Sequence, residues 1–62
     1  MRVRAPAVLS GTGEHTRAIV TDGDHEGIAW FLYEPPTRDR DGDVVTLEFC
    51  PDDQFAWIVE TP

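Results

Sequence analysis

Apolar residues recur at every second position through much of this chain, and this period of two most restricts what it can fold into. Successive side chains of a β-strand point to opposite faces, whereas the apolar face of a helix repeats every three or four residues. In the segment 43–50, for example, Val45, Leu47 and Phe49 fall on one face. The spacing predicts an all-β fold. Its five strands are expected at residues 2–9, 16–21, 27–34, 43–50 and 55–60.

The segments between these strands have the composition of turns. Asp22-Gly23 and Asp41-Gly42 are Asp-Gly steps, which are frequent in hairpins. Pro35-Pro36 ends the third strand because proline has no N–H for a sheet, and Pro51 suits the first central position of a tight turn. We therefore expect one domain over residues 1–62: a small five-stranded antiparallel meander curled into an SH3-like or OB-like barrel.

Two segments leave alternatives open. Pro6 interrupts the first strand, so this strand is expected at an edge of the sheet. At the other end, Asp52 could cap a helix over residues 53–61. The β-branched residues Ile58 and Val59 favour a strand there instead.

The length of the chain limits how it can be stabilised. A domain of 62 residues buries only ~60% of the surface that its unfolded chain exposes. No disulfide can form within it, because Cys50 is the only cysteine, and a lone cysteine fits a reducing, cytoplasmic setting. The longest apolar run covers residues 28–33, whereas a membrane-spanning helix needs ~20 residues. We therefore expect no membrane association.

The charge is strongly negative, at −7, with 12 acidic residues against five arginines and no lysine. This composition fits a chain from a high-salt or high-GC organism, since molar salt screens the repulsion. It also fits an acidic inhibitor or nucleic-acid mimic that binds a basic protein surface. Direct nucleic-acid binding is not expected, because contact with phosphates depends on a basic footprint.

No residue pattern predicts catalysis or a bound metal. The loop 39–43 begins like a calcium loop, but Val44 stands where the turn glycine belongs and Cys50 where the bidentate glutamate belongs. The acidic segment 22–26 lacks the ligand spacing of zinc sites. Cys50 with His15 or His25 lacks a third group to orient a base. We expect no catalytic residue, cofactor or metal site.

The third strand is apolar on both faces, which a single curled sheet cannot bury by itself. Alternation places one set of its large side chains outward, unless the N-terminal strand or the loop after Pro36 covers it, and the pattern does not say which set. Exposed apolar patches often mark interaction sites. We therefore predict a non-enzymatic protein-interaction module that binds a protein partner or a second copy as a homodimer. Alternatives are the acidic inhibitor and an uncharacterised metal-binding or enzymatic domain. The predicted partner-binding residues are Trp30, Phe31, Leu32, Tyr33 and Trp57.

Overall fold

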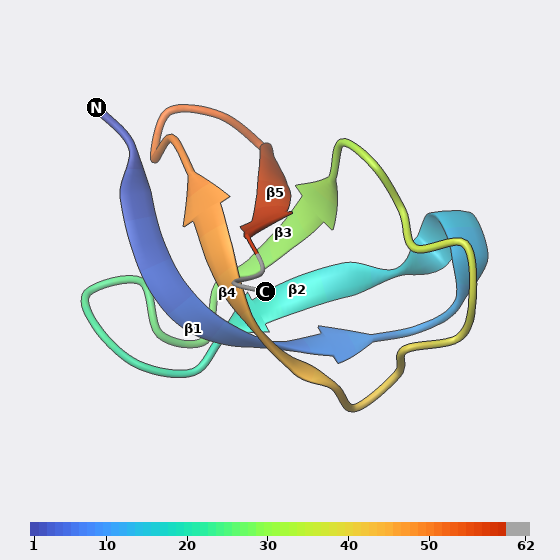
Figure 1. Cartoon of the computed structure of the whole chain (residues 1–62). Coiled ribbons are helices and arrows are strands. Elements are labelled where there is room, and N and C mark those ends of the chain that lie inside the picture. The colour runs from blue at the N-terminus through green and yellow to red at the C-terminus, as the bar shows by residue number, and fades with distance from the viewer. Residues whose placement is uncertain (60–62) are drawn as a thin grey trace.

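The computed structural model describes residues 1–59 of the chain. Its regular elements are β1 (Val3–Ser10), the short 3-10 helix η1 (Gly13–His15), β2 (Arg17–Val20), β3 (Ala29–Leu32), β4 (Val44–Phe49) and β5 (Phe55–Val59) (Figure 1). The prediction of an all-β fold is confirmed. β5 forms in the segment for which a helix over residues 53–61 was the alternative. Glu60, the last residue of the predicted strand, and Thr61, the last residue of the alternative helix, lie outside the described residues.

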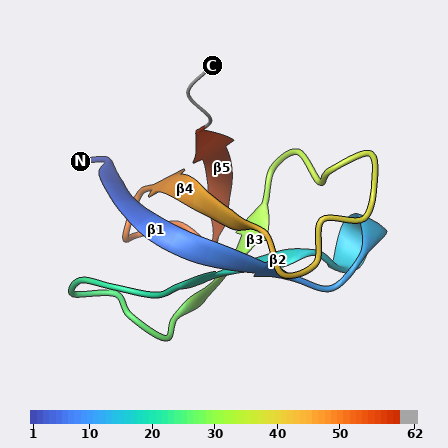
Figure 2. The same ribbon diagram turned by 60° about the horizontal axis from the view of Figure 1, so that its bottom comes forward.

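The five strands form a sheet that closes in a ring, in the order β1-β2-β3-β5-β4 with β4 beside β1. The predicted antiparallel meander is wrong in two respects. β3 and β5 run parallel, with Phe31 opposite Phe55 and Leu32 opposite Ala56, and β4 pairs with β1 instead of with β3. The physical reason is the long segment 33–43. It carries the chain across to β1, so that β4 pairs there and β5 turns back into the gap beside β3 (Figure 2). Parallel strands require such a crossing connection.

β1 is the strand that bends most visibly, and it is paired on both sides (Figure 1). Its first part pairs with β4 and its last part, from Ala7 onward, pairs with β2. The prediction of an edge strand is therefore wrong. Pro6 is tolerated because it lies just outside the β1–β2 register. Its carbonyl accepts a 2.9 Å hydrogen bond from the backbone N–H of Thr21.

The core is built from every second residue of each strand. Leu47 and Phe49 of β4 are fully buried, and each such side chain contributes about 1.5–3 kcal/mol by leaving water. Trp30 stacks on Phe49 with ring centroids 4.3 Å apart. Trp30 and Leu32 thus turn inward from β3, which settles which of its two faces is buried. The members of the core are Ala7, Leu9, Ala18, Val20, Trp30, Leu32, Val45, Leu47, Phe49 and Ala56.

The segment 33–43 is fastened to the far end of β1. The backbone N–H of Gly42 donates to the carbonyl of Leu9 over 2.7 Å, and a carboxylate oxygen of Asp41 accepts from the N–H of Gly11 over 2.9 Å. Gly11 has a φ of +92°, and a Cβ built there would lie 2.7 Å from the carbonyl oxygen of His15. Glycine is therefore required at this closure, which holds the crossing segment in place.

Candidate functional site

Four aromatic side chains project outward from β3, from the residue that follows it, and from β5, and they contact one another in a row. We call this row the aromatic ladder; in order, its members are Phe31, Phe55, Tyr33 and Trp57. Successive ring centroids lie 5.7, 5.1 and 4.5 Å apart, and the last pair is stacked at an interplanar angle of 22°. Aromatic pairs attract at these separations. The ladder therefore joins the two parallel strands on their outer side.

An arginine covers the ring at each end of the ladder. The guanidinium of Arg17, from β2, lies 5.0 Å from the centroid of Phe31, and that of Arg2 lies 5.0 Å from the centroid of Trp57. At such distances a cation is attracted to the face of an aromatic ring. The ladder is therefore a row of four rings with a positive charge at either end.

Glu48 holds the arginine at the Trp57 end. Its carboxylate accepts hydrogen bonds from Arg4 and from Arg2, each over 3.0 Å. These two arginines, Arg4 first, lower the pKa of Glu48 below its ordinary value. Glu48 stands opposite Trp57 in the β4–β5 register. An ionised carboxylate thus orients Arg2 over the last ring of the ladder.

The hydroxyl of Tyr33 donates a hydrogen bond to the carboxylate of Asp53. This bond raises the pKa of Tyr33, because it favours the protonated phenol beside a negative charge, and it lowers the pKa of Asp53. Asp53 closes the predicted tight turn around Pro51, since its N–H donates to the carbonyl of Cys50 over 2.8 Å. The bond therefore fixes the ladder to the β4–β5 turn.

The ladder remains accessible although its rings contact one another. Its four members expose between 36% and 44% of their surface, whereas Trp30 and Leu32 on the opposite face expose 5% and 6%. Of the five residues predicted to bind a partner, Phe31, Tyr33 and Trp57 therefore lie together on the surface, and Trp30 and Leu32 lie in the core. The prediction omitted Phe55. Phe55 lies two residues before Trp57, and residues two apart in a strand share a face. The sequence pattern could therefore have placed Phe55 beside Trp57.

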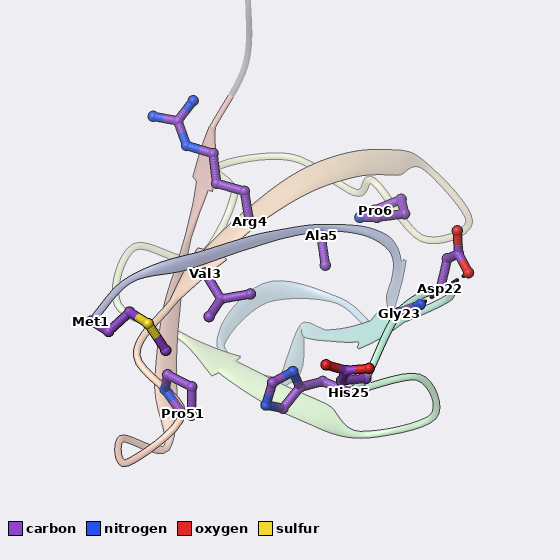
Figure 3. Close-up of a pocket in the computed structure, with 10 residues that line it drawn as sticks. Met1, Val3, Arg4, Ala5, Pro6, Asp22, Gly23, His25 and Pro51 are labelled. Atoms are coloured by element: carbon purple, nitrogen blue, oxygen red, sulfur yellow. Dashed lines mark hydrogen bonds between the residues drawn. The ribbon is translucent and has the colours of Figure 1, made fainter.

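A hollow of about 410 Å³ opens between the first half of β1 and the loop that joins β2 to β3. Val3 and Ala5 point into it and Arg4 points away (Figure 3). His25 reaches in from the loop, and its ring meets Phe49 edge-on with centroids 5.1 Å apart. His25 thus covers this end of the core. The hollow is a surface depression at the same end, and its lining is largely apolar.

Two smaller hollows adjoin the ladder, one at each end. A hollow of about 320 Å³ is lined by Phe31, Pro51 and Asp53, among others. The second, of about 200 Å³, is lined by Trp57 and Glu34, among others. The exposed rings therefore continue at both ends into surface depressions that a partner's side chains could fill.

Two of the three carboxylates of the loop 39–43 bond within the loop, and the third, that of Asp41, accepts from the N–H of Gly11. Asp39 accepts a hydrogen bond from the N–H of Asp41, and Asp43 forms a 3.0 Å ion pair with Arg40. Within residues 1–59, no three His, Cys, Asp or Glu side chains gather as a group that could hold a metal ion. No helix in this part of the chain has the length and apolar character needed to cross a membrane.

Comparison of the chain with protein-family models, with curated proteins and with solved structures found no match. The case for a function therefore depends on the geometry of the ladder and its surroundings.

Proposed function

We propose that this chain is a non-enzymatic interaction module that binds a protein through the aromatic ladder. The observation that carries the proposal is the exposure of four contacting aromatic rings on one outer face, between 36% and 44% each. Aromatic residues are enriched at protein interfaces because they supply large contact area at low conformational cost. An exposed row of this kind on a small domain is a candidate for coverage by a partner.

The order of the strands supports the OB-like alternative over the SH3-like one. β4 returns by the long segment 33–43 to lie beside β1, which gives the spatial order 4-1-2-3 of a Greek key. An OB-fold is a five-stranded Greek-key barrel that binds ligands such as oligonucleotides and oligosaccharides on the face of its second and third strands. The ladder begins on β3 and its first ring is covered by Arg17 of β2, so it would lie at that face.

Three features favour a protein over a single-stranded nucleic acid as the ligand. Stacking of bases requires free ring faces and a basic groove along the backbone. Here Arg17 and Arg2 cover the faces of the two end rings, and Tyr33 and Trp57 stack on each other. The net charge of −7 opposes binding to phosphates. The four residues nevertheless keep 36% to 44% of their surface exposed to the apolar and aromatic side chains of a protein.

Affinity capture with matched variants tests the proposal. The wild-type chain, Phe55→Ser and Val44→Ser would be immobilised and exposed to an extract of the source cells. Val44 is a suitable control because it is 75% exposed and belongs to β4, outside the ladder. We expect one protein that the wild type and Val44→Ser retain and that Phe55→Ser loses, with equal near-ultraviolet circular dichroism for all three. Equal retention by all three, or a bound species that nuclease removes, would refute the proposal.

A further inference from the structure

We infer that the occupant of the ladder is a second copy of this chain, related by a two-fold axis that brings Arg17 of each copy against Glu34 of the other. This inference rests on the proposed function, because it takes the ladder as the binding surface. A closed two-fold pair is the commonest arrangement of soluble oligomers, and it uses the same surface on both copies.

Two opposite charges lie beside the ladder, Arg17 at one end and Glu34 at the other, where Arg2 also covers Trp57. Arg17 lies over Phe31 at one end, and Glu34 lines the hollow beside Trp57 at the other. Neither forms an ion pair within the part of the chain that the structure describes. A two-fold axis through the middle of the ladder superposes the first end on the second. Each dimer would then contain two Arg17–Glu34 contacts.

The neighbouring charged groups are already engaged. At the Trp57 end, Arg2 and Arg4 are held by Glu48, and Arg40, which lines the same hollow as Glu34, is paired with Asp43. At the Phe31 end, the carboxylate of Asp53 accepts a hydrogen bond from the hydroxyl of Tyr33. These pairings leave Arg17 and Glu34 as the complementary charges beside the ladder.

Six of the other acidic residues lie in two segments of the chain. The loop 21–28 carries Asp22, Asp24 and Glu26, and the segment 33–43 carries three further aspartates. These two segments lie at opposite sides of the molecule (Figure 1). The ladder, with an arginine at either end, lies on β3 and β5 between them. Two chains of charge −7 that meet through the ladder therefore repel one another at long range, and salt should weaken this repulsion.

The area of the ladder sets the strength of the pair. Rings of this size, each about two-fifths exposed, present roughly 300 Å² in all. A stable interface buries about 800 Å² on each partner, so the ladder and its margins support a weak, reversible dimer. Because each copy carries −7, salt screens the long-range repulsion more than it screens ion pairs in direct contact. Self-association should therefore strengthen as salt rises, whereas binding to a basic protein would weaken.

Sedimentation velocity on the intact chain tests the pair first. At protein concentrations from about 10 μM to 1 mM, we expect the mass to rise from the 7.0 kDa of one chain toward twice that value. The rise should be larger in 1 M KCl than at ~0.15 M. Phe55→Ser should remain a monomer, and Val44→Ser should behave as the wild type. A mass that stays at that of one chain at 1 mM in both salts would overturn the inference.

A charge exchange then tests the Arg17–Glu34 contact itself. Arg17→Glu and Glu34→Arg each place like charges together twice in a homodimer, so each should raise the dimer dissociation constant at least about tenfold. Glu34→Arg is the more discriminating variant. It lowers the net negative charge, which by itself would favour association, and yet it should weaken the dimer. An equimolar mixture of the two variants restores both contacts and should associate as well as the wild type. Arg38→Glu and Glu14→Arg change the net charge equally at residues that neither belong to the ladder nor line its two hollows, and they should not reproduce the loss.

The outcomes separate this inference from the proposed function. If the mixture associates no better than either variant alone, the two-fold contact is refuted. If the chain stays monomeric while capture finds a different protein that Phe55→Ser loses, the inference fails and the proposed function stands. If the chain stays monomeric and capture finds no ladder-dependent protein, both fail.

Discussion

Phe31 of β3 stands opposite Phe55 of β5 in the parallel register, and the centroids of their rings lie 5.7 Å apart on the outer face. The parallel register extends over Phe31–Phe55 and Leu32–Ala56. Closure of the ring of strands at this point therefore depends on side-chain contacts as well as on backbone hydrogen bonds. The ladder supplies these contacts outside, and the core supplies them inside.

The first prediction concerns the coupling of these two rings. Aromatic pairs contribute about 0.5–1.5 kcal/mol beyond the area that they bury. A double-mutant cycle of Phe31→Ala and Phe55→Ala, measured by urea unfolding, should give a coupling free energy in that range. Val44→Ala, on an exposed site away from the ladder, should change stability by less than about 0.5 kcal/mol. Strict additivity of the two phenylalanine variants would show that the ladder does not stabilise the closure.

The second prediction concerns the ionisation of Tyr33. The hydrogen bond to Asp53 raises the pKa of Tyr33 above its ordinary value of 10.0. Because it is the only tyrosine, absorbance at alkaline pH reports on it alone. The stability that this bond provides is present below pH 10.0 and should be lost as pH rises through the higher folded pKa. Asp53→Asn keeps an acceptor but removes the charge, so it should bring the midpoint back toward 10.0. Identical midpoints of tyrosine ionisation in the wild type and in Asp53→Asn would show that the charge of Asp53 does not raise the pKa of Tyr33.

The third prediction concerns Glu48. Arg4 and Arg2 lower its pKa below 4.5, so the folded state binds this proton less readily than the unfolded state. The resulting stabilisation is present above pH 4.5 and should be lost as pH falls through the lower folded pKa. Glu48→Gln should therefore make unfolding less dependent on pH below 4.5 than it is in the wild type. Parallel profiles of the free energy of unfolding against pH would exclude this ion-pair group as a source of acid sensitivity.

The strands, the tight turn at Pro51 and the apolar faces followed from local patterns. Each depends on neighbours in the sequence, since period two and turn chemistry act over a few residues. The parallel β3–β5 pair could not be predicted in this way, because it depends on where the segment 33–43 crosses and on its attachment to Gly11. The same path gives β1 a partner strand on both sides. For this reason the presence of Pro6 did not indicate an edge strand.

The candidate site was partly predictable for a related reason. Phe31, Tyr33 and Trp57 were expected at a partner surface, but the alternation of β3 could not show which of its faces was inside. Trp30 turned inward because it stacks on Phe49, a contact between strands distant in sequence. The two arginines at the ends of the ladder come from outside β3 and β5, so only the folded arrangement places them over Phe31 and Trp57.

The fourth prediction concerns salt and tests the high-salt hypothesis. A charge of −7 on this small body destabilises the compact state by self-repulsion. The melting temperature should rise with KCl, because the Debye length falls to ~3 Å at 1 M. Asp22→Asn combined with Asp24→Asn removes two charges from one acidic loop and should reduce the rise. A melting temperature that does not respond to molar KCl would refute this account of the acidity.

The most direct test of the ladder as a binding surface is site-specific photo-crosslinking in the source cells. Phe55 would be replaced by p-azidophenylalanine, which keeps an aromatic ring in the ladder, and Val44 would be replaced likewise as the control. We predict that the chain labelled at position 55 becomes crosslinked to a second copy of itself. The chain labelled at position 44 should form no crosslink. Equal crosslinking from both positions, or none from position 55, would contradict the central claim that the ladder binds a protein.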